Sequence, residues 1–193
     1  MFDNKVTRTL ASAAALAMIC TACQQAVGGN ASPPQDTPPT VQRPRDLPLD
    51  KVDPCQLLTS EQQRTFAIDA PGRPATSTMF ENGSVCNYSA WADRSGLSFT
   101  LIKNAGIDFF AKKNINAELR DLDIIGFRAR EMFTPLASHL DPFCTIVVDV
   151  AKGQVLHTMF DKSIDKERLT REQVCAKAKQ GAEAAVTTLM AMR

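Results

Sequence analysis

Hydrophobic and polar residues alternate along several segments in the middle of the chain. Leu97, Phe99 and Leu101, for example, are separated by Ser98 and Thr100. This period of two is typical of a strand with one buried face. Turn residues separate several of these segments, so neighbouring segments are expected to pair as antiparallel hairpins. The predicted strands are residues 85–92, 97–103, 122–133, 144–150 and 154–160.

Other segments place apolar residues at helical spacing. Thr59 and Gln62 can form a capping box, which predicts a helix over 59–67. An equivalent box at residues 170–173 predicts a helix that continues to the C-terminus. The amphipathic pattern of residues 106–119 predicts a further helix lying on the sheet. The expected fold is therefore α+β, with an antiparallel sheet of about five strands and helices packed mainly on one face.

The N-terminal end has the pattern of an export signal. Lys5 and Arg8 precede an apolar run of 13 residues, 10–22, which is shorter than the roughly 20 residues of a membrane-spanning helix. Small residues stand directly before Cys23. Residues 1–22 are therefore predicted to be a lipoprotein signal peptide, and Cys23 is predicted to be the acylated N-terminus, with palmitate among its acyl chains.

Two other interpretations of this end remain open. Cys20 and Cys23 have the Cys-x-x-Cys spacing of a thioredoxin-like redox site, although such a site belongs after a strand in a folded domain. An ordinary cleaved signal peptide would instead release a free secreted protein.

Residues 23–50 differ in composition from the rest of the chain. They hold six of the eleven prolines and few large apolar side chains, so they cannot bury enough surface to offset the entropy of ordering. We expect a disordered Pro-rich tether over 23–50 and a single α+β domain over 51–193.

The charge pattern limits the partners. The formal net charge is +1, with both signs mixed along the chain, whereas a nucleic-acid binder shows a basic patch or stripe. There is also no Lys/Arg cluster of the kind that binds anionic lipids. Attachment to the membrane is therefore expected only through the N-terminal lipid, on the extracytoplasmic face of the cell membrane.

Four cysteines, Cys55, Cys86, Cys144 and Cys175, fall in the predicted domain. An even number in an exported chain predicts disulfides. We favour the local pairing, 55 with 86 and 144 with 175, because it would join a helix to a neighbouring strand in each case, while the nested pairing, 55 with 175 and 86 with 144, stays open. Because none of the spacings is that of a zinc site, no metal is expected.

Residues 53–59, Asp-Pro-Cys-Gln-Leu-Leu-Thr, resemble the opening motif of the DUF3558 lipoproteins of actinobacteria. The resemblance continues in a Cys-aromatic segment and in the order of the later cysteines, carried here by Cys86, Tyr88, Trp91, Cys144 and Cys175. It spans about residues 50–193 and implies an actinobacterial envelope lipoprotein. The family implies no particular activity.

Side chains suited to catalysis are few. His157 shares a predicted strand face with Val155 and Met159, which is typical of a half-buried structural histidine. His139 lies in a loop with Ser138 and Asp141 as near neighbours, and adjacent residues on one loop do not generally align as a triad. No catalytic residue and no cofactor are predicted.

Tyr88 and Trp91 are the only Tyr and Trp in the chain. Both lie on the first predicted hairpin, where amphipathic rings are favoured at interfaces. They form the candidate binding surface, with core filling as the other interpretation.

We therefore expect a membrane-anchored, non-enzymatic domain that binds an envelope protein or a small envelope ligand. The alternatives are a hydrolase or transferase that acts on envelope material, and a lipid carrier with an apolar cavity between sheet and helices.

Overall fold

The computed structural model describes residues 43–192, except 82, 113, 115, 136–139 and 166. The chain divides into two units, residues 1–38 and 39–193, and the description below concerns the second. The predicted signal peptide, the acylation site Cys23 and the candidate His139 lie outside the described residues.

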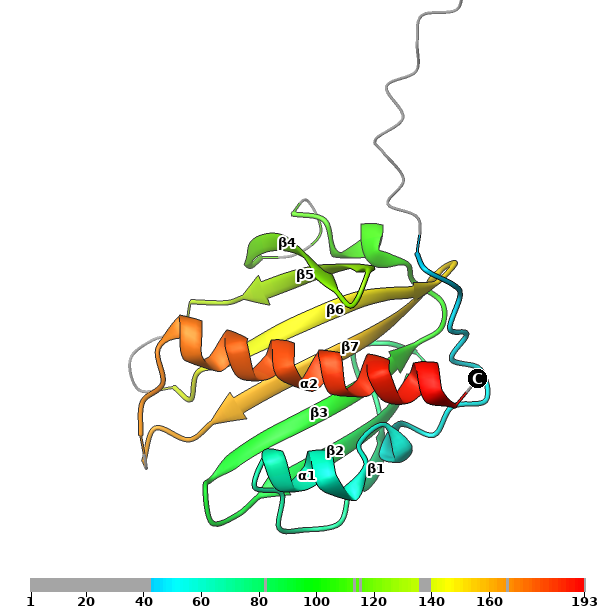
Figure 1. Ribbon diagram of the computed structural model, residues 1–193. Coiled ribbons are helices and arrows are strands. Elements are labelled where there is room, and N and C mark those ends of the chain that lie inside the picture. The colour runs from blue at the N-terminus through cyan, green and yellow to red at the C-terminus, as the bar shows by residue number, and fades with distance from the viewer. Residues whose placement is uncertain are drawn as a thin grey trace, which may run out of the picture. The chain divides into compact units, whose positions relative to one another are not determined.

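A single antiparallel sheet dominates the described part of the chain (Figure 1). It has seven strands in the order β1-β2-β3-β7-β6-β5-β4, two more than the predicted number of about five. The strands are β1 (Arg73–Thr76), β2 (Ser84–Ala90), β3 (Ser95–Ile102), β4 (Glu118–Ile124), β5 (Phe127–Phe133), β6 (Phe143–Ala151) and β7 (Gln154–Lys162).

The sheet consists of two meanders that meet at one pair of strands. The first meander is β1–β3 and the second is β4–β7, and they are joined where β3 pairs with β7. Along this junction, which we call the seam, Ser98 is the partner of Met159 and Thr100 is the partner of His157. The seam therefore brings together strands that lie far apart in the sequence.

Two predicted helices are confirmed with their caps. In α1 (Ser60–Thr65) and in α2 (Arg171–Ala191), Thr59 and Thr170 form the expected capping boxes with Gln62 and Gln173. Helix α2 crosses one face of the sheet (Figure 1) and buries Val174, Ala178, Ala182, Val186 and Leu189 against it. A short 3-10 helix, η1 (Pro54–Gln56), precedes α1.

The predicted helix over 106–119 is wrong. A single 3-10 turn, η2 (Ile107–Phe110), forms there, and β4 begins at Glu118. The Asn114 side chain donates to the carbonyl of Phe109 at 2.8 Å, and such local hydrogen bonds compete with helix formation.

The predicted strand 122–133 is two strands, β4 and β5. Ile125 and Gly126 form the turn between them, with φ values of 53° and 82°. Two consecutive positive φ values are the mark of a tight two-residue hairpin turn. Strand β1, which the sequence did not predict, is exposed along its whole length and contains Pro74, so it has no alternating pattern, and its position at the edge of the sheet suits proline.

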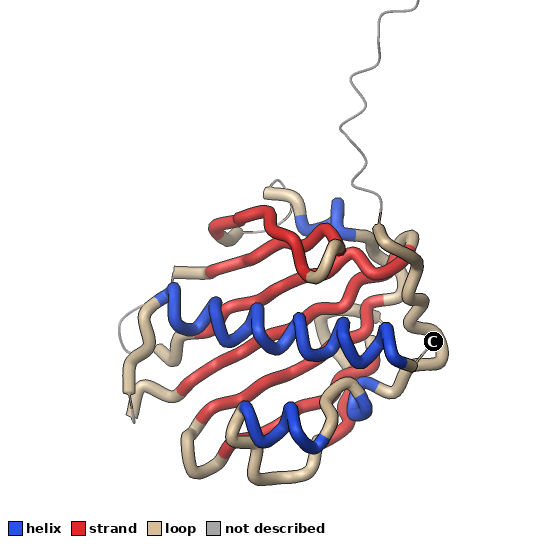
Figure 2. The backbone as a smooth tube through the Cα atoms, viewed as in Figure 1, coloured by secondary structure: helices blue, strands red, loops and turns tan. Residues whose placement is uncertain are grey.

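The core lies between α2 and the sheet, on what we call the helix face. It contains Phe99, Phe127 and Leu156, all fully buried. It also contains Leu47 and Leu49, which fall in the segment predicted to be tether. Residues 43–50 pack along the domain beside the C-terminal end of α2 (Figure 2), and the Leu47 N–H donates to the Val150 carbonyl at 2.8 Å.

The described residues contain disulfides between Cys55 and Cys86 and between Cys144 and Cys175, the local pairing of the arrangements left open above. Each joins a helix to a strand, η1 to β2 and β6 to α2.

Candidate ligand-binding groove

The face of the sheet opposite α2, which we call the outer face, carries a second apolar cluster. Side chains alternate between the two faces along each strand. Leu156 therefore belongs to the core, while Val155 packs on the outer face with Ile102, Met132 and Val147. Three residues from the connections complete this cluster, namely Phe80, Ile107 and Phe110.

An apolar cavity of about 450 Å³ opens over this cluster. Its volume lies within the roughly 300–1,000 Å³ that is typical of small-molecule sites. Two of its residues, Met79 and Phe109, are 79% and 47% exposed, so apolar side chains reach the opening of the cavity, together with the exposed Asn114 and Asn116. The main apolar residues that line it are Met79, Phe80, Phe109, Phe110, Met132, Phe143 and Met159.

His157 lies in this cavity. Its ring centroid is 6.1 Å from that of Phe80 and 6.5 Å from that of Phe110. Its Nδ1 is buried and makes no hydrogen bond to any described residue. Burial among apolar groups lowers the pKa of His157 to about 4. At neutral pH the cavity therefore holds a neutral imidazole.

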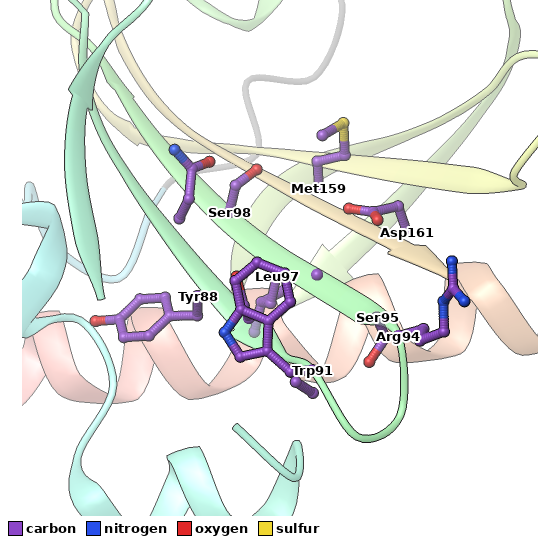
Figure 3. A pocket seen from close by; sticks show the side chains of 12 residues that line it. Tyr88, Trp91, Arg94, Ser95, Leu97, Ser98, Met159 and Asp161 are labelled. Carbon is purple, nitrogen blue, oxygen red and sulfur yellow. The ribbon is translucent and has the colours of Figure 1, made fainter. Parts of the chain in front are cut away.

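A polar groove of about 320 Å³ lies across β3 and β2 (Figure 3). Met159 lines both this groove and the apolar cavity. Ser98, Met159 and Asp161 project from the same side of the sheet (Figure 3), and Asn87 and Ser89 line the groove from β2. The groove is therefore a site of mainly uncharged hydrogen-bonding groups, with a single carboxylate at one side and the Arg94 guanidinium in its lining.

That carboxylate, Asp161, makes no hydrogen bond or ion pair with any of the described residues. Burial raises the pKa of Asp161, and the negative charge of Asp141 raises it further. Room for the side chain comes from its neighbour on β3. A Cβ at Gly96 would lie 2.6 Å from Asp161 Oδ1. Glycine at this position lets the carboxylate lie over the strand.

The structure separates the two aromatic residues of the predicted binding surface. Tyr88 is a core residue, 2% exposed, and its hydroxyl donates to the Cys55 carbonyl at 2.8 Å. Burial raises the pKa of Tyr88 to about 12. Trp91 is 62% exposed and lines the polar groove. Of the pair, only the Trp91 side chain is available to a ligand.

The position of Trp91 is fixed by the turn that carries it. The Asp69 carboxylate accepts hydrogen bonds from the backbone N–H groups of Ala92 and Trp91 at 2.9 and 2.8 Å. These two bonds hold the pKa of Asp69 below its ordinary value. The Arg73 guanidinium lies 5.4 Å from the centre of the Trp91 ring.

One further cluster has the residue types of a metal site. Ligand atoms of Glu131, Cys144 and Cys175 lie within 4.8 Å of one another on the helix face. The two sulfur atoms are joined as a disulfide, whereas zinc sites use thiolates. Glu131 accepts a hydrogen bond from Arg120 at 2.6 Å. In the oxidised protein, these groups are parts of the core.

The fold and the groove define a disulfide-linked domain with a ligand-sized cavity on the outer face of its sheet. Within the described residues, no helix is both long enough and apolar enough to cross a membrane. The family model of DUF3558, described as "Protein of unknown function (DUF3558)", matches residues 18–188. The chain belongs to this family, as its opening motif and cysteine order predicted. No curated protein and no solved structure matches the chain.

Proposed function

We propose that the protein is an actinobacterial lipoprotein, anchored through Cys23 at the extracytoplasmic face of the cell membrane, that binds a ligand with an apolar chain. In this proposal the helices lie mainly on one face of the sheet, and the ligand binds on the other. The domain is a binding module, and it forms no covalent bond with its ligand.

The apolar cavity is the observation that carries this proposal. Phe80, Phe110 and Met132 of its lining belong to the cluster on the outer face, which is separate from the core that holds the domain together. Burial of an apolar chain stabilises binding by roughly 25 cal/mol per Å². Phe80, Phe110 and Met132 are themselves buried, so the walls are formed before a ligand arrives.

His157 bears on the alternative of a hydrolase or transferase. A general base works best with a pKa near the working pH. With a pKa of about 4, the imidazole binds protons weakly at neutral pH. A neutral ring beside Phe80 and Phe110 instead suits the wall of an apolar site. The other alternative, a lipid carrier, shares the chemistry proposed here, although the cavity lies on the outer face rather than between sheet and helices.

Binding of an alkyl chain tests the cavity directly. A dansyl-labelled undecanoic acid should gain fluorescence on binding to the purified domain, because the dye moves out of water. The Ala117→Phe variant places a ring in the cavity that Ala117 lines and should weaken binding about tenfold or more. The matched Ala176→Phe variant, on the exposed side of α2, should bind as the wild type does. No binding by a folded wild-type domain would refute the cavity as a ligand site.

Anchoring needs a separate test. Cells fed an alkyne-labelled fatty acid should acylate the wild-type protein, and the Cys23→Ala variant should lose both the label and membrane retention. A Cys20→Ala variant is the matched control and should keep both. Normal acylation of the Cys23→Ala variant would refute the assignment of Cys23.

A further inference from the structure

We propose that the polar groove binds a hydroxyl-rich head group, so that the ligand is a glycosylated amphiphile whose chain occupies the apolar cavity. This inference rests on the proposed function, and it adds the chemical class of the ligand.

The two sites adjoin along the seam. Met159 lines both the cavity and the groove. Its partner on β3 is Ser98, in the groove, and its partner on β6 is Thr145, in the cavity. Two residues further along β7, Asp161 of the groove pairs with Phe143 of the cavity. A molecule that fills the cavity and extends past Met159 therefore places its next atoms beside Asp161.

The Asp161 carboxylate offers the groove a hydrogen-bond acceptor that is not already used by a donor from the described residues. The carboxylate is partly withdrawn from water, and within the described residues nothing donates a hydrogen bond to it. An acceptor that is partly withdrawn from water gains stability from a direct hydrogen-bond partner. A ligand O–H or N–H in the groove would provide one.

The other groups in the groove favour a neutral polyol. The Asn87 amide and the Ser89 and Ser98 hydroxyls both donate and accept hydrogen bonds, and so do sugar hydroxyls. An ammonium group would use only their acceptors. A phosphate would meet the charge of Asp161, while the nearest cation in the lining, Arg94, is paired with Asp165 at 2.7 Å.

Trp91 adds an aromatic surface for the carbon side of a sugar ring, on the face of the indole that the Arg73 guanidinium does not cover. Its indole is 62% exposed at the border of the groove, and Figure 3 shows the ring standing beside the strands that carry the polar side chains. The C–H face of a pyranose ring packs well on such an aromatic surface, while its hydroxyls point outward. A sugar beside Trp91 would thus have both the apolar and the polar partners that it needs.

The test compares head groups on one alkyl chain. Trp91 is the only Trp in the chain, so its fluorescence reports occupancy of the groove. Titrations below the micelle-forming concentrations would use dodecyl maltoside, dodecylphosphocholine, dodecyltrimethylammonium and dodecanol. We expect dodecyl maltoside to bind about tenfold or more tightly than dodecanol, and the other two to show no such gain.

The Asp161→Asn variant should lose about tenfold in affinity for the maltoside and little in affinity for dodecanol. Calorimetry with Trp91→Ala should show a selective loss for the maltoside too.

The controls separate this inference from the proposed function. The Glu183→Gln variant removes a carboxylate from the exposed part of α2 and should bind all four probes as the wild type does. Equal affinity for the maltoside and dodecanol would overturn the head-group inference while the cavity stands. A gain for the ammonium or phosphocholine probe that exceeds the gain for the maltoside would also overturn it. Failure of every probe to bind a folded domain would refute the proposed function itself.

Discussion

Replacing His157 with leucine should remove much of the acid sensitivity of the folded domain. His157 lies in the apolar cavity, and burial lowers its pKa from 6.5 to about 4. In the unfolded chain the same imidazole regains its ordinary pKa. Below pH 6.5 the unfolded state therefore binds a proton that the folded state does not, and acid favours unfolding.

The magnitude follows from the two pKa values. At pH 7 both states are mostly neutral at this residue, and the contribution is near zero. At pH 5 the unfolded imidazole is almost fully protonated and the folded one is not, which lowers the free energy of unfolding by about 2 kcal/mol. The loss approaches about 3 kcal/mol at pH 4, where the folded group begins to titrate.

The assay is urea denaturation of wild type and variant at pH 7 and at pH 5. Between these two values the wild type should lose about 2 kcal/mol more than His157→Leu, which corresponds to roughly 1 M in the urea midpoint. Asp161 shifts in the opposite sense, since a raised carboxyl pKa stabilises the folded state as the pH falls. The comparison between variant and wild type cancels that contribution.

The control for this prediction is Met159→Leu. Met159 lies on the same strand and in the same cavity, but it does not titrate. It should therefore keep the pH dependence of the wild type, whatever its effect on stability. Parallel pH profiles for the wild type and His157→Leu would show that the imidazole is not held neutral by the cavity.

Three further variants test the core and the turns by urea denaturation. Replacing Cys144 and Cys175 together with alanine opens a loop with a sequence separation of 31 residues and should cost about 3–4 kcal/mol. Gly181→Val should cost about 1–3 kcal/mol, because even a Cβ at Gly181 would lie 2.8 Å from Leu97 Cδ1. Ile125→Asn should stabilise the domain by about 1 kcal/mol, because asparagine tolerates the positive φ of 53° that a β-branched residue disfavours.

Each of these has an outcome that contradicts it. If the domain with both Cys144 and Cys175 replaced folds correctly and is as stable as the wild type, the disulfide does not contribute to the free energy of unfolding. Gln180→Val, on the exposed side of α2, should change stability by less than about 0.5 kcal/mol, and an equal loss at both positions would contradict close packing at Gly181. A loss of stability in Ile125→Asn would show that the isoleucine side chain contributes more than the turn conformation costs.

The parts of the fold that the sequence predicts correctly are those with local signals. The capping boxes of Thr59 and Thr170 depend on residues three positions apart, and both form as expected. The alternation around Leu97 and Phe99 predicts β3 because one side of that strand faces the core. The helix predicted over residues 106–119 does not form. The apolar residues of this segment pack in the second cluster instead, where Ile107 and Phe110 cover the outer face.

The groove could not be derived in the same way. Its central pair, Ser98 and Met159, is 61 residues apart (159 − 98) and meets only through the register of the seam. Asp161 gives no signal in the sequence, because a carboxylate at the end of a strand is ordinarily solvated. The sequence predicts the strand face of His157 correctly, but the burial of its ring depends on Phe80 and Phe110, which come from separate connections. Trp91 is a candidate from the sequence because it is the only tryptophan.

The seam also bears on the order of assembly. Cys55–Cys86 links η1 to the first meander, and Cys144–Cys175 links the second meander to α2. Each part can therefore be oxidised before the two meet, and neither of these bonds crosses the junction of β3 and β7. The proposed binding surface exists only after that junction has formed. A bound amphiphile would hold the two meanders together, and the amide hydrogens along β3 and β7 should then exchange more slowly with solvent.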